Sequence, residues 1–73
     1  MLLSELTIGQ SARVESVIDD GGLAARLMEM GIIPGIELRL IGKAPFGDPL
    51  EFELRGYRLS LRQREAECVT VAP

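Results

Sequence analysis

The stretch MEMGIIPG, residues 28–35, carries the strongest turn signal of the chain. Gly31 stands where a helix commonly ends in a left-handed residue, a conformation that glycine adopts without steric cost. Pro34 then prevents a return to helix. Gly35 closes the turn, and apolar and polar residues alternate over 36–40 as in a strand. We therefore predict that Gly31, Pro34 and Gly35 form a structural helix-to-strand turn and not a binding site.

Upstream of this turn, the apolar spacing predicts one short helix over about Gly22–Met30. Leu23, Leu27 and Met30 recur at spacings of four and three, which places them on one helical face. A helix this short is marginal in isolation, so we expect this face to pack against a sheet. The aspartates at positions 19 and 20 are expected to cap its first turn by accepting hydrogen bonds from free N–H groups.

Alternating apolar and polar residues predict five strands around this helix. The expected strands cover residues 11–18, 36–43, 50–55, 58–62 and 68–71. In the first, Ala12, Val14, Ser16 and Ile18 share the face that we expect to be buried. The third and fourth form a hairpin that turns at or beside Gly56. Five short strands with one inserted helix predict a mainly β fold, a partly open barrel of the SH3 or OB kind.

The composition excludes several classes of protein. The chain has 73 residues, a net charge of −3, no histidine and a single cysteine. The acidic balance argues against nucleic acid as a partner, because such affinity depends on Lys and Arg at the phosphates. One cysteine cannot form an internal disulfide, which favours the cytosol. No apolar run approaches the length of a membrane span, so we expect no direct membrane insertion.

Catalytic and metal sites have little support in the sequence. Without histidine the chain lacks the commonest general base and transition-metal ligand, and it has no GxxxxGK[ST] phosphate loop. Cys68 is expected to be a small buried hydrophobe, and its neighbours Glu65 and Glu67 to be solvated carboxylates. We predict that the chain is not an enzyme and has no metal ligands of its own. A divalent ion such as Fe²⁺ or Zn²⁺ would bind weakly, at the surface.

Two segments are candidates for binding a partner protein. The first is the loop APFGDP, residues 44–49, which is rigid because each proline fixes its own φ. Within it, Pro45, Phe46 and Asp48 are our candidate contact residues. Phe46 has two equally supported placements: exposed for a partner, or folded back over one end of the barrel. The second segment is the exposed side of the helix, around Arg26 and Glu29.

The order of these motifs resembles that of the ferrous iron transport protein A (FeoA) family. The likeness rests on LSEL at residues 3–6, the helix and turn RLMEMGIIPG at 26–35, the loop APFGDP at 44–49, and LSLR at 59–62. It extends over nearly the whole chain and implies a single domain of residues 1–73. It also implies an SH3-like β-barrel, which the strand pattern alone does not separate from an OB-like one.

The resemblance further implies a function. FeoA proteins are small cytosolic accessories of bacterial ferrous iron uptake, and the expected partner is the cytosolic part of the FeoB-type permease, which carries a GTP-binding domain. The alternative is a metal-responsive regulatory module, since a similar domain ends repressors of the diphtheria-toxin-repressor type. No oligomeric state follows from the resemblance.

Overall fold

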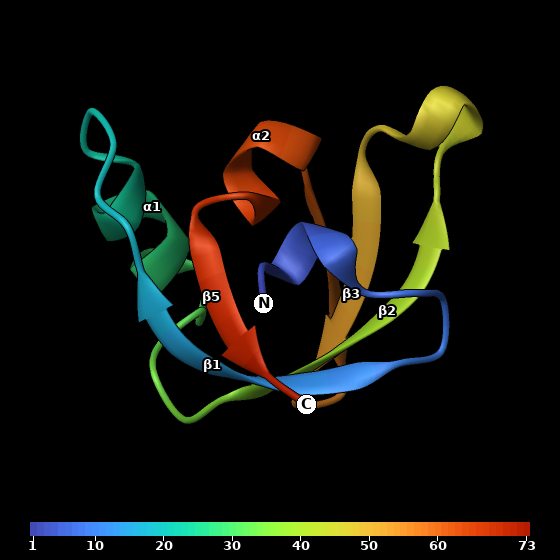
Figure 1. The fold of residues 1–73 in the computed structure, drawn as a ribbon, viewed down its shortest axis with the longest axis horizontal. Helices are drawn as coiled ribbons and strands as arrows, with labels where there is room; N and C mark the ends of the chain where they lie inside the picture. The colour runs from blue at the N-terminus through green and yellow to red at the C-terminus, as the bar shows by residue number, and fades with distance from the viewer.

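Five antiparallel strands form one curved sheet with the order β4-β3-β2-β1-β5 in the computed structural model, which describes residues 1–73 (Figure 1). The strands are β1 (Ser11–Val17), β2 (Glu37–Lys43), β3 (Leu50–Leu54), β4 (Tyr57–Leu61) and β5 (Val69–Ala72). The hairpin between β3 and β4 turns at Arg55 and Gly56, which confirms the predicted turn at or beside Gly56, and both residues have positive φ. The mainly β prediction is confirmed, and the sheet curls into a partly open barrel.

Short helical elements connect these strands. They are η1 (Leu3–Glu5), α1 (Leu23–Glu29), η2 (Pro45–Gly47) and α2 (Gln63–Ala66). The helix predicted over Gly22–Met30 is α1, and Leu27 on its inner face is fully buried. Leu23 and Met30 pack against the core from either end of the same face, as the apolar spacing predicted.

Helix α1 ends in a left-handed turn at Gly31, as the sequence predicted. Gly31 has φ +98°, and its N–H donates to the carbonyl of Met28 at 3.0 Å. The N–H of Ile32 donates to the carbonyl of Leu27 at 3.0 Å, which completes a Schellman motif. Ile32 is fully buried beneath the turn. Residues 31–35, called the central turn below, therefore join α1 to β2 and also fill part of the core.

The predicted aspartate cap of α1 is wrong. Gly22, at φ +84°, occupies the N-cap position, and no side chain caps the helix. The backbone carbonyl of Asp20, not its carboxylate, accepts the hydrogen bond from Leu23 N at 3.2 Å. The two glycines after the aspartates bend the chain so that a backbone turn replaces the side-chain cap.

A β-bulge changes the buried face of β1. The register with β5 shifts between Val14 and Ser16. Ala12 and Val14 face the core as predicted, but beyond the bulge Val17 packs inward, whereas Ser16 and Ile18 are exposed. The extra residue reverses the alternation, because each strand position beyond it moves to the opposite face.

The core contains sixteen buried residues, all of them apolar. Phe52 is its only aromatic member, and leucine, isoleucine and valine supply most of the rest. No buried side-chain nitrogen or oxygen lacks a hydrogen-bond partner. The barrel is therefore held by aliphatic packing, and its polar chemistry lies at the surface.

The two edge strands of the sheet, β5 and β4, differ in what covers them. At β5, Leu2 forms a bridge with Thr70, and Val71 N donates to the carbonyl of Met1 at 2.8 Å. The opposite edge strand, β4, pairs only with β3. The N-terminal residues thus protect one edge, and the other keeps free backbone groups.

Candidate partner-binding surface

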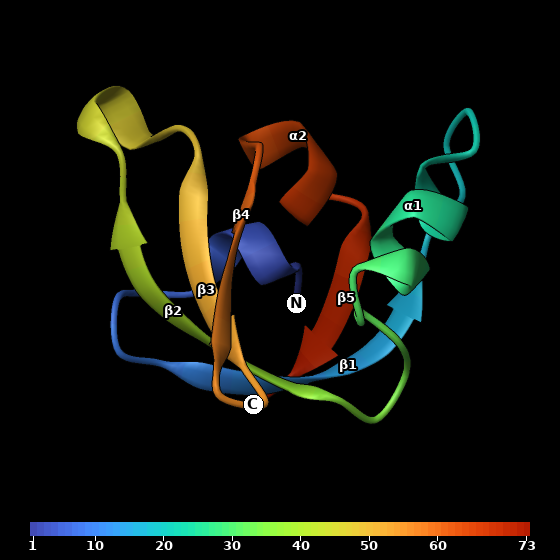
Figure 2. The same ribbon diagram turned by 180° about the vertical axis from the view of Figure 1, so that it is seen from behind.

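Three elements far apart in the sequence lie along one end of the barrel. Figures 1 and 2 show α1, α2 and the yellow η2 segment along the same rim, with α2 in the middle. This rim carries both segments that the sequence singled out. The central turn lies lower on the molecule, where α1 leads into β2.

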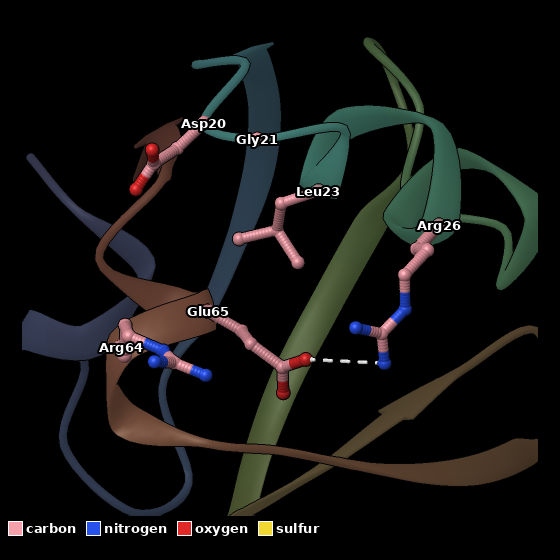
Figure 3. A pocket seen from close by; sticks show the side chains of 6 residues that line it. All are labelled: Asp20, Gly21, Leu23, Arg26, Arg64 and Glu65. Atoms are coloured by element: carbon pink, nitrogen blue, oxygen red, sulfur yellow. Dashed lines mark ion pairs between the residues drawn. The ribbon is translucent and has the colours of Figure 1, made fainter.

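An ion pair joins α1 to α2. A guanidinium nitrogen of Arg26 lies 3.7 Å from a carboxylate oxygen of Glu65, and Figure 3 shows Arg26 reaching across toward it. The Arg26 side chain is 71% exposed, whereas that of Glu65 is only 13% exposed. The other carboxylate oxygen of Glu65 accepts a hydrogen bond from Arg62 N at 2.7 Å, at the start of α2. Glu65 is therefore held in place, and it positions the more exposed Arg26.

A shallow polar cavity of about 250 Å³ lies beside this ion pair. It is lined by Asp20, Gly21, Leu23, Arg26, Arg64 and Glu65, which Figure 3 shows together. Glu29 does not line it: this residue is exposed farther along α1, next to Met28, which is 52% exposed. Glu29 and Met28 are thus exposed on the outer side of α1, whereas Arg26 is directed toward α2.

Residues 44–49, called the tip loop below, project from the same rim. Phe46 is fully exposed. Of its two predicted placements, the exposed one is therefore correct and the one folded over the end of the barrel is wrong. Pro45 is exposed beside it. Asp48 is also exposed, but its Oδ1 accepts a hydrogen bond from Gln63 N at 2.9 Å, at the first residue of α2. Asp48 therefore ties the tip loop to α2.

Residues 63–67 suit one turn of helix in the sequence, but helix α2 was not among the predicted binding segments. It contacts α1 through Glu65 and the tip loop through the N–H of Gln63. The spacing of Arg62 and Glu65 is the local signal that a helix starts here, because a glutamate at the third helical position can accept from the N-cap N–H. Nothing in the sequence pairs Glu65 with Arg26, 39 positions upstream.

Tyr57 was also missed. Its hydroxyl donates to the carbonyl of Met30 at 2.7 Å and so fastens the end of α1 to the start of β4. A Cβ at Gly31 would lie 2.6 Å from the same hydroxyl oxygen. Glycine at position 31 thus suits the left-handed backbone, and any larger residue would have to displace the Tyr57 hydroxyl. Pro34 and Gly35 complete the central turn, where Gly35 has φ +92°.

The remaining candidate ligands lie apart from one another. The Sγ of Cys68, which is half-buried, donates a weak hydrogen bond to the carbonyl of Arg64 at 3.6 Å. Glu67 is exposed next to it. No three His, Cys, Asp or Glu side chains gather closely enough to form a metal site. None of the helices has the length and apolar character needed to cross a bilayer.

Solved structures of several relatives share this architecture. The NMR structure of a FeoA-like protein from Clostridium acetobutylicum superposes with a TM-score of 0.91 at 39% identity, covering 99% of this chain and 84% of that one. The zinc complex of Stenotrophomonas maltophilia FeoA, described as a prokaryotic SH3 domain protein, gives 0.87 at 42% identity, with 99% and 89% covered. The predicted SH3-like fold is confirmed.

A manganese-dependent transcriptional repressor bound to manganese has a TM-score of 0.90 but only 19% identity, covering 99% of this chain and 35% of that one. At that identity the likeness shows the fold alone. Among curated proteins, a fusion of Fe(2+) transport protein A with the Fe(2+) transporter FeoB from Porphyromonas gingivalis is 34% identical over 71 residues. That match covers 97% of this chain, which spans 8% of the length of the fusion protein.

The family model described as the FeoA domain matches residues 1–73, the full length of the sequence. The motifs of the helix, central turn and tip loop, the SH3-like barrel and this match agree with one another. The chain belongs to the FeoA domain family.

Proposed function

We propose that this protein is a non-enzymatic accessory of ferrous iron transport, located in the cytoplasm, that binds and modulates the cytosolic part of a FeoB-type GTPase permease. The P. gingivalis fusion carries this proposal, because in that protein a segment similar to nearly the whole of this chain is covalently joined to FeoB. Covalent linkage keeps two domains at high effective concentration, which is useful when they act together. Separate chains would achieve the same by binding.

The rim formed by α1, α2 and the tip loop is the surface that we assign to this contact. The Arg26–Glu65 ion pair and the hydrogen bond from Gln63 N to Asp48 connect its three elements. The rim presents charged groups together with the exposed apolar side chain of Phe46, and Met28 is a second exposed apolar side chain on α1. A few apolar anchors with polar groups around them are typical of protein interfaces.

The first test is a titration of the full chain with the cytosolic part of the permease, nucleotide-free and with GDP or a GTP analogue. Binding in at least one state is expected, as is altered ferrous iron uptake when the gene is deleted. No binding in any nucleotide state, together with unchanged uptake in the deletion strain, would refute the proposal.

Two ion pairs of similar geometry provide a matched control for the surface. Arg26 and Glu65 lie 3.7 Å apart on the rim, whereas Arg39 and Glu53 lie 3.6 Å apart on the outer face of the sheet. Removing Arg26 should weaken binding about fivefold, as expected for a contact of roughly 1 kcal/mol. Removing Arg39 should leave binding unchanged. Equal effects of Arg26→Ala and Arg39→Ala would place the interface elsewhere.

For metals, we propose weak surface binding only. The zinc complex of the S. maltophilia protein shows that a related barrel was solved with a divalent ion. In this chain the carboxylates and Cys68 are dispersed, so an ion such as Zn²⁺ or Fe²⁺ would find few ligands at any one point. The metal-responsive alternative gains no support from the repressor likeness, which concerns the fold. Calorimetry with Zn²⁺ or anaerobic Fe²⁺ should detect no tight site.

A further inference from the structure

Phe46 combines two properties that contribute nothing to folding of the barrel. Its backbone is left-handed, with φ +70° and ψ +10°, a conformation that residues with a Cβ rarely adopt. Its side chain is fully exposed, with a relative accessibility of 105%. Large apolar side chains in strained backbone conformations persist where the surrounding structure imposes them, and they cluster at functional positions.

The tip loop holds Phe46 in this conformation. Ala44 N donates to the carbonyl of Pro49 at 2.9 Å, and Gly47 N donates to the carbonyl of Ala44 at 2.8 Å. These two bonds close the loop around Phe46, and Asp48 fixes its far side to α2. Figure 1 shows this yellow segment projecting beyond β2 and β3. The ring is thus presented by an ordered backbone, which lowers the entropy lost on binding.

The charges near the ring favour a protein over a lipid surface. Lys43 precedes the tip loop and Asp48 lies within it, with opposite charges, and Glu51 follows in β3. The whole chain has a net charge of −3. Peripheral insertion into bacterial membranes relies on basic residues beside the apolar group, because the lipid surface is anionic. An apolar socket in a folded protein has no such requirement.

We infer that Phe46 is a preorganised anchor, whose ring enters an apolar socket on the protein partner. This inference rests on the proposed function, and it specifies the chemistry of the partner: a pocket large enough for a phenyl ring, lined by apolar side chains. The left-handed backbone at Phe46 directs the ring outward, at the expense of stability.

The other left-handed residue that is not glycine supplies a matched control. Arg55 has φ +48° in the β3–β4 hairpin turn, away from the rim. Phe46→Gly and Arg55→Gly should both unfold at the parent temperature or above it, since each relieves strain. Only Phe46→Gly should lose binding to the cytosolic part of the permease, by about 30-fold, as expected for a buried aromatic anchor.

Phe46→Ala and Phe46→Leu separate the ring from the backbone. Both keep a Cβ at this position, and only leucine can fill much of an apolar socket. We expect Phe46→Ala to lose about 30-fold in affinity and Phe46→Leu to recover most of it. If Phe46→Ala bound the permease as tightly as the wild-type chain, this inference would be overturned and the proposed function would stand. No binding by the wild-type chain in any nucleotide state would overturn both.

Vesicles of phosphatidylethanolamine and phosphatidylglycerol test the lipid alternative. The wild-type chain should not sediment with them. If the wild-type chain sedimented with the vesicles and Phe46→Ala did not, the ring would enter a bilayer. That result would overturn the assignment of a protein socket.

Discussion

The central turn and the tip loop have the same local chemistry but opposite environments. Each contains proline and glycine, and each places two residues at positive φ: Gly31 and Gly35 in the first, Phe46 and Gly47 in the second. The backbone reverses in a few residues in both cases. The composition of a turn therefore sets its backbone path and does not reveal its purpose.

What separates the two segments is the contact that each makes with distant parts of the chain. In the central turn, Ile32 is fully buried and Gly31 lies against the hydroxyl of Tyr57. In the tip loop, the largest side chain, Phe46, faces solvent, and only Asp48 is tied to another element. Substitutions should accordingly affect folding in the first segment and binding in the second.

Gly31→Val should have the largest effect on folding. It forces a β-branched residue into φ +98° and places a Cβ 2.6 Å from the Tyr57 hydroxyl oxygen. We expect a loss of roughly 3–5 kcal/mol in the free energy of unfolding. The matched control is Gly35→Val, at φ +92° with nothing within 4 Å of its Cβ, which should cost distinctly less. A thermal midpoint of Gly31→Val equal to that of the parent would contradict the assigned role of Gly31.

Ile32→Ala should have the second-largest effect on folding, because it leaves a cavity beneath the central turn. Ile32 has no exposed surface, whereas its neighbour Ile33 is 38% exposed. Truncation should cost about 2–4 kcal/mol at Ile32 and under about 1 kcal/mol at Ile33. Chemical denaturation of the two variants measures the difference. Equal costs would mean that the turn packs less closely than described.

A double-mutant cycle of Gly31→Ala and Tyr57→Phe should show coupling. Tyr57→Phe removes the hydroxyl that lies against Gly31, and the next atom that a Cβ would meet is Leu54 Cδ1 at 3.6 Å. Alanine at position 31 should therefore cost about 1 kcal/mol less in the Tyr57→Phe background. Additive costs would show that strain at φ +98° alone, and not the approach of Tyr57, makes glycine necessary.

Asp48→Ala should have a smaller effect, because it removes one hydrogen bond between the tip loop and α2. The expected loss is about 0.5–1 kcal/mol, typical of a capping interaction at a helix start. Asp48→Asn keeps an acceptor for Gln63 N, which lies 2.9 Å away, and should cost less. Thermal unfolding of both variants gives the comparison, and a larger loss for asparagine would argue against the capping role.

Phe46→Ala should have the smallest effect on folding. The ring is fully exposed, so its removal should change the free energy of unfolding by no more than about 0.5 kcal/mol. Thermal unfolding checks this directly. A drop comparable to that of Ile32→Ala would place the ring against the barrel and erase the contrast between the two segments.

Local patterns in the sequence were enough to predict much of the barrel. The spacing of Leu23, Leu27 and Met30 identified the buried face of α1, and Gly31 identified its end. The alternation of Ile36, Leu38 and Leu40 identified the core face entering β2. These features depend on neighbours within a few residues, which is why periodicity and turn chemistry reveal them.

The features that escaped prediction depend on the rest of the fold. The bulge after Val14 is set by pairing with β5, which lies at the other end of the chain. The ion pair of Arg26 with Glu65 needs the barrel to bring α1 and α2 together. For Phe46 the sequence left two placements open, because only the assembled loop determines the direction of the ring.

The unequal protection of the two sheet edges has a consequence for hydrogen exchange and self-association. The amides of β4 that point away from β3 have no backbone partner, so they should exchange with solvent without any opening of the sheet. The Val71 amide, which donates to Met1, should exchange more slowly. An unpaired edge is also where a second chain could add a strand. The charged Arg58 on β4 opposes such edge-to-edge pairing between identical copies.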